Sequence, residues 1–168
     1  MEPAKGLADQ VEKWISWLPG VGTYRDREKR RETDKKIREH VAEQLQSVRG
    51  HLKRVMLDFS RNGKSDLLID LDHLSAQIQQ MSDTIRYASY GYGGIFDLDK
   101  IREEEIHRLC SFDLSLKEEA EKLQRKIEEI TPALAADDLK RKILETGAVV
   151  VSLQENYRRR KDFMGQKA

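Results

Sequence analysis

Two helix-spaced pairs of a carboxylate and a histidine are the residues of this chain that could hold a metal ion. Glu104 and His107 lie three residues apart, and Asp70 and His73 repeat this spacing. Carboxylate-bridged di-iron bundles use such pairs, but both side chains must point into the bundle and further glutamates must come from two other helices. The apolar pattern places Glu104 and His107 on an outer face, and Asp70 and His73 beside an apolar seam. We therefore expect solvated charged residues here and no bound metal or other cofactor.

Residues typical of other enzyme classes are not combined in this sequence. Cys110 is the only cysteine, so no intrachain disulfide can form, and no paired base marks it as a nucleophile. We find no glycine-rich phosphate loop after a strand and no nucleophile elbow. Asp113 falls on an apolar seam, where a carboxylate needs polar partners, and a symmetric hairpin would place it near Ser75 and Gln79. Polar seam residues more often fix helix register than perform catalysis, so we expect a protein that is not an enzyme and has no small-molecule substrate.

Two segments are basic enough to be considered for nucleic-acid binding. In residues 25–38, eight basic residues alternate with acids, often at the i, i+4 spacing of ion pairs, which is typical of a solvated helix. Residues 157–161 (Tyr-Arg-Arg-Arg-Lys) are less compensated and could contact phosphates or lipid headgroups, or could form a cationic last turn that suits the helix dipole. The formal net charge of +1 gives no overall field. Nucleic acid is therefore not an expected partner.

An amphipathic segment with both tryptophans lies near the start of the sequence. Residues 6–18 place apolar side chains on one face of a predicted helix, and residues 19–22 (Pro-Gly-Val-Gly) then end the helix and provide a hinge. The segment resembles an interfacial membrane anchor in outline, but it is short, and residues 1–18 carry three acids against two bases, so anionic lipid would not attract it. We expect its apolar face to dock on the bundle or on a protein partner, with a membrane surface as the alternative. The residues predicted to make this contact are Trp14, Ile15, Trp17 and Leu18.

A segment rich in glycine and aromatic residues spans Tyr90–Phe96. Three of the four residues at 91–94 are glycines, which permit tight backbone geometry, and the aromatic side chains can cover the end of a bundle. We expect a corner between two helices. The same segment could serve as a recognition loop, because tyrosine offers rigid contact area at a low entropy cost. Its recognition residues would then be Tyr90, Tyr92 and Phe96.

Apolar residues recur three and four positions apart through most of the chain, which predicts long amphipathic helices. The predicted helices cover about residues 24–60, 66–89, 97–130 and 132–164. A turn at 61–64 should make the first two of them an antiparallel hairpin, and Pro132 marks the start of the last. The two clearest seams are Leu67, Leu71, Leu74, Ile78, Met81 and Ile85, and Leu116, Ala120, Leu123, Ile127, Ile130 and Leu134.

Three details of these helices are less regular. The helix predicted at 24–60 is almost wholly charged from its start to Arg38. We therefore expect its first half to be solvated and its second half to be buried. A capping-box spacing between Ser115 and Glu118 permits a break near residues 111–115, but the seam continues and favours one helix. The β-branched run at 148–151 would have no partner strand elsewhere, so we predict that it is helical.

These patterns predict an all-α fold, an elongated antiparallel bundle of coiled-coil hairpins preceded by a short amphipathic N-terminal helix. Residues 1–20 would form that helix and its hinge, and residues 21–168 would form the bundle domain. A composition of 38% hydrophobic and 36% charged residues suits thin helices that need little core per residue.

Several amphipathic helices rarely close every apolar stripe within one short chain, so we expect a scaffold or interaction protein that binds itself or a protein partner. A single cysteine, the lack of a signal-like start and the lack of any apolar stretch near the ~20 residues that span a bilayer indicate a cytoplasmic protein. The alternative is a peripheral membrane protein anchored by its N-terminal helix. A metal-binding bundle protein is the third hypothesis.

Overall fold

The structure is a computed structural model, and the residues that it describes are 29–88 and 102–165. Four helices account for nearly all of them: α2 (Arg30–Arg61), α3 (Leu68–Arg86), α4 (Glu103–Glu128) and α5 (Ala136–Gly165), with a short 3₁₀ turn, η1, at Ser65–Leu67. These ranges contain no strand, and the prediction of an all-α bundle is confirmed. The N-terminal helix, its hinge and the Tyr90–Phe96 segment lie outside the described residues.

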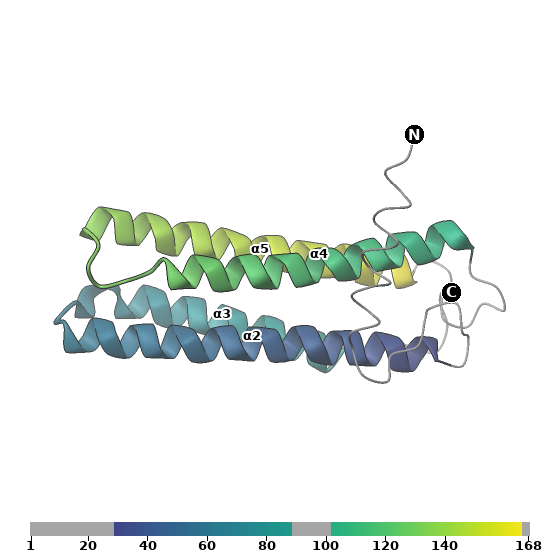
Figure 1. Cartoon of the computed structure of the whole chain (residues 1–168), viewed down its shortest axis with the longest axis horizontal. Coiled ribbons are helices and arrows are strands. Elements are labelled where there is room, and N and C mark those ends of the chain that lie inside the picture. Colours follow the sequence, from purple (N-terminus) through teal and green to yellow (C-terminus); the bar gives the residue numbers. More distant parts are fainter. Residues whose placement is uncertain (1–28, 89–101, 166–168) are drawn as a thin grey trace.

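The four helices form two hairpins that pack on each other (Figure 1). Within each hairpin the helices run in opposite directions, α2 against α3 and α4 against α5. Helix α2 packs on α3 and α4, and α5 packs on the same two helices. Helices α2 and α5 therefore lie on one diagonal of the bundle, and α3 and α4 lie on the other.

The apolar seams predicted from the sequence meet in one core. The residues of the two clearest seams are buried, except Leu134, which is partly buried and packs against the core. The seam residues predicted for α5 are also buried: Leu139, Ile143, Val150, Leu153 and Tyr157. The seams of α2 to α5 thus close within a single chain. Any surplus apolar area that could favour association must lie elsewhere on the surface.

The turn after α2 lies where the sequence predicts it. Gly63 has a positive φ of 70°, its N–H donates to the carbonyl of Ser60, and the N–H of Lys64 donates to the carbonyl of Phe59. This pair of hydrogen bonds is a Schellman motif, which satisfies the last carbonyls of a helix and needs a left-handed residue, usually glycine. After this turn, Ser65 begins η1, which leads directly into α3.

Two predicted helix starts are wrong. Helix α4 begins at Glu103 after an extended Arg102, and not at Asp97. Helix α5 begins at Ala136 and not at Pro132, because residues 131–135 form a turn. In this turn the N–H of Leu134 donates to the carbonyl of Thr131, and the carbonyl of Leu134 accepts a hydrogen bond from Lys64 Nζ at 2.9 Å. The continuity of α4 through residues 111–115 and the helical state of residues 148–151 are confirmed.

Candidate functional site

A completely buried arginine lies in the core between two aspartates. Arg160 of α5 has 0% of its surface exposed. Its Nε donates to Oδ1 of Asp113 in α4 at 2.6 Å, and its Nη2 donates to Oδ1 of Asp34 in α2 at 2.8 Å. Its Nη1 lies 2.9 Å from the sulfur of Met164. Because α2 and α5 are diagonal in the bundle, this guanidinium spans the core.

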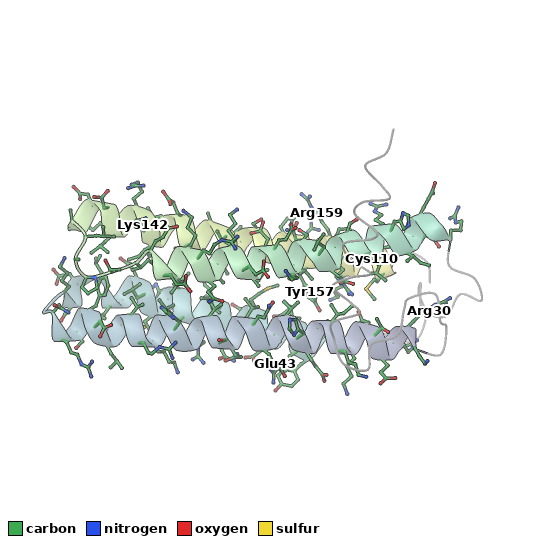
Figure 2. All side chains as sticks on the ribbon, viewed as in Figure 1. Arg30, Glu43, Cys110, Lys142, Tyr157 and Arg159 are labelled. Carbon is green, nitrogen blue, oxygen red and sulfur yellow. The ribbon has the colours of Figure 1, made fainter. Side chains whose placement is uncertain are left out.

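A second arginine extends these contacts to the remaining helix. Arg38 Nε donates to Oδ2 of Asp34 at 2.9 Å, and its Nη1 donates to the carbonyls of Ile85 and Arg86 at 3.2 and 3.3 Å. These carbonyls end α3, where a cation satisfies acceptors that lack helical partners and suits the helix dipole. Together Arg38 and Arg160 connect all four helices at the end of the bundle where α2 begins; Figure 2 labels Arg30 and Cys110 near the same end.

We refer to Asp34, Arg38, Asp113 and Arg160 as the buried ion-pair cluster. An arginine side chain stays protonated in proteins, and each aspartate accepts a hydrogen bond from at least one arginine. Buried ion pairs of this kind fix the register between helices. If one helix were shifted along its axis, a charge would be left unpaired in the core. The geometry of the cluster suits fixing helix register rather than proton transfer.

The cluster corrects the predicted surroundings of Asp113. The sequence placed Asp113 near Ser75 and Gln79, on the assumption that α3 and α4 are neighbours. These helices are diagonal, and Ser75 and Gln79 instead accept hydrogen bonds from side chains of α2. Asp113 instead accepts a hydrogen bond from Arg160, which the sequence placed in a cluster of bases near the end of the chain.

That basic cluster at 157–161 is not an uncompensated positive surface. Arg160 lies in the core, and Arg158 and Arg159 each donate to Glu155 at 2.9 Å. The hydrogen bonds from Arg158 and then Arg159 lower the pKa of Glu155 to about 2, well below its ordinary value of 4.5. Two of the three arginines thus form surface ion pairs within their own helix.

The charged first half of α2 is also less solvated than predicted. Its i, i+4 pairing is present, as between Lys36 Nζ and Glu32 Oε1 at 2.7 Å. One face of it is nevertheless buried, because its charged side chains have partners inside the bundle. The buried residues of this half are Arg30, Thr33, Asp34, Ile37 and Arg38.

The pairs with metal-binding spacing lie on the surface of the bundle. Glu104, Asp70 and His73 are exposed, and His107 is half-buried. No three histidine, cysteine or acidic side chains come together as a possible metal site within residues 29–88 and 102–165. Cys110 is buried in α4.

A groove with two hollows runs between α3 and α5, and we call it the α3–α5 groove. The proximal hollow, of about 520 Å³, lies near the start of α2, and the distal hollow, of about 440 Å³, lies nearer the opposite end. The proximal hollow is lined by Gln80, Met81, Thr84, Tyr87, Ala88, Gln154, Tyr157, Arg158 and Lys161. The distal hollow is lined by Asp70, His73, Leu74, Gln77, Lys140, Ile143, Leu144, Gly147 and Val151.

The α5 wall of the distal hollow carries exposed apolar side chains. Leu144 is 75% exposed and Val151 is 59% exposed, and they lie seven residues apart on the same face of α5. Tyr87, 75% exposed, lines the proximal hollow. This row was not predicted, because Leu144 and Val151 lie outside the apolar stripe of α5 that faces the core. The i, i+7 spacing of Leu144 and Val151 was the signal available.

The site residues predicted from the sequence, which are Trp14, Ile15, Trp17, Leu18, Tyr90, Tyr92 and Phe96, lie outside the described residues. None of the helices in the part of the chain that the structure describes combines the length and the apolar character needed to cross a bilayer. A comparison of the chain with protein-family models, with curated proteins and with solved structures finds no match.

Proposed function

We propose that this chain is a non-enzymatic interaction protein whose α3–α5 groove binds an amphipathic helix of a second copy or of another protein. The observation that supports this most directly is the exposure of Leu144 and Val151, one heptad apart, on the wall of a groove. Helices that bind in grooves present anchors at i, i+3, i+4 and i+7, so a groove with apolar contacts at this spacing matches such a ligand.

The rest of the bundle supports a role as a rigid platform for this surface. The seams of α2 to α5 are closed in the core, and the buried ion-pair cluster ties the same four helices together at one end. Binding surfaces on packed helices hold their geometry better than those on loops. The walls of the groove, α3 and α5, are therefore held in place by the packed core and by the buried ion-pair cluster.

A photo-crosslinking side chain at position 144, in the full chain produced in its native host, tests this proposal. We expect light to join position 144 to a defined protein, identified by mass spectrometry, and we expect a Val151→Glu change to abolish the adduct. Position 57 provides the matched control, because Leu57 is also a largely exposed leucine but belongs to α2. Adducts that form equally from both positions, or from neither, would contradict the proposal.

A further inference from the structure

The proximal hollow has an apolar floor and lies at the end of the bundle where α2 begins. Met81 and Tyr157 form its buried floor, and the exposed ring of Tyr87 stands at its rim beside Ala88. Arg38 contacts the carbonyls of Ile85 and Arg86, so the last turn of α3 lies level with Arg38 of α2. The start of α2 and the proximal hollow thus share one end of the bundle.

The residues before α2 are long enough to return to this hollow. Helix α2 continues for eight residues from Arg38 back to Arg30, which corresponds to about 12 Å at 1.5 Å per residue. Residues 19–28 can span roughly 33 Å when extended, and they begin with Pro-Gly-Val-Gly, a sequence suited to a change of direction. A segment that ends at residue 18 can therefore reach the hollow of its own molecule.

We propose that residues 7–18 of this chain dock as an amphipathic helix in the proximal hollow of the same molecule. The apolar face that the sequence predicts for this segment includes Trp14 and Leu18, and tryptophan is the side chain with the largest apolar area to bury. Twelve helical residues measure about 18 Å. This length covers the proximal hollow and leaves Leu144 and Val151 of the distal hollow accessible.

Tethering favours this occupant. A short tether gives the segment an effective concentration in the millimolar range at its own groove, above that of any second copy at ordinary protein concentrations. This proposal does not depend on a partner in the distal hollow, so either proposal can fail without the other.

Tryptophan fluorescence of the intact chain tests the docking directly, because Trp14 and Trp17 are the only two tryptophans. We expect emission at shorter wavelength than in the urea-unfolded chain, and no change in emission from nanomolar to micromolar concentration. A Thr84→Glu/Gln154→Glu variant places two carboxylates on the exposed walls of the hollow. We expect it to move the emission toward that of the unfolded chain and to increase quenching by acrylamide.

The matched control carries Ser47→Glu and Ser60→Glu, two exposed positions on α2 that are outside the groove. It should keep the emission of the unchanged chain, and circular dichroism should show equal helix content in both variants. Long-wavelength emission from the unchanged chain, or short-wavelength emission that survives in the groove variant, would overturn the proposal. A blue shift that develops only with rising protein concentration, or only with lipid vesicles, would assign the segment to a second copy or to a membrane and would overturn it equally.

Discussion

Arg160 and Asp34 belong to helices on opposite corners of the bundle, yet Arg160 Nη2 donates to Asp34 Oδ1 at 2.8 Å through the core. Arg160 also binds Asp113 of α4, while Asp34 also accepts a hydrogen bond from Arg38. Two charged side chains on diagonal helices can meet only where the apolar side chains between them leave room. The cluster therefore specifies how the two hairpins are aligned along their length.

The first prediction concerns the contribution of this cluster to the free energy of unfolding. Asp113→Leu and Arg160→Met should each lower the free energy of unfolding by about 3–5 kcal/mol, because each change leaves a partner charge buried with fewer contacts. The double variant should be more stable than either single variant, since Asp34 keeps Arg38 as its partner. Urea unfolding followed by circular dichroism measures all three values.

Arg159→Met is the control for these three variants, because Arg159 is an exposed arginine next to Arg160 and forms its ion pair with Glu155 on the surface. Exposed ion pairs contribute little to stability, so its unfolding midpoint should hardly move. Losses that simply add in the double variant would show that Arg160 and Asp113 do not act as a pair.

The second prediction concerns the end of α3. Arg38→Met removes the two hydrogen bonds to the carbonyls of Ile85 and Arg86, so the last turn of α3 should fray. Native-state hydrogen exchange should accelerate for the amides of residues 82–87 while the amides around Leu71 and Leu74 keep their protection. Arg38→Lys retains the charge without the planar fork of donors and should give an intermediate rate. Uniform acceleration along α3 would contradict a local capping role.

The helices and the core follow from the sequence because helical periodicity is local. Every seam residue predicted for α3 and α5 is buried, and the turn between α2 and α3 lies where it was predicted. Helix starts were predicted less well, because Pro132 can begin a helix or a turn with equal ease. The pairing of α2 with α3 required only a short turn, whereas the neighbours of α4 depend on how the hairpins stack, and no local pattern determines that.

The buried ion-pair cluster was only partly visible in the sequence. Arg160 continues the seam of Leu153 and Tyr157, so its seam position could have been recognised, but its place in a run of three arginines suggested a surface. Asp34 likewise continues the seam of α2 toward its start. The sequence alone could not predict which acid pairs with which base, because the stacking of whole hairpins determines which residues of diagonal helices come together.

The third prediction concerns pH. Ion pairs with Arg158 and Arg159 lower the pKa of Glu155 from 4.5 to about 2. A hydrogen bond from Lys142 lowers the pKa of Glu129, and one from Lys126 lowers the pKa of Glu145. A carboxylate whose pKa is lower in the folded chain stabilises it above the unfolded pKa and loses that contribution as pH falls. The urea midpoint should thus be steady near neutral pH and fall between about pH 4.5 and 2.

Glu155→Gln serves as the comparison for this titration, because it keeps the shape of the side chain and removes the titrating group. Its midpoint should fall less over the same acidic range and should match that of the unchanged chain at the lowest pH. Added salt should flatten both curves, since these pairs are exposed to solvent. Identical pH profiles for the two proteins would show that Glu155 is not perturbed in the folded chain.

The last prediction concerns association through the distal hollow. Leu144 and Val151 leave apolar area exposed beside a groove, so we expect sedimentation equilibrium of the full chain to reveal dimers or larger particles at micromolar concentration. Leu144→Glu/Val151→Glu should shift this equilibrium toward monomer with little change in stability, because surface changes of this kind usually alter the unfolding free energy by only about 0.5 kcal/mol. Leu57→Glu should leave the association intact, because Leu57 is exposed on α2 outside the groove. A full chain that stays monomeric at every concentration would rule out a second copy as the ligand of this groove and leave a different protein as its partner.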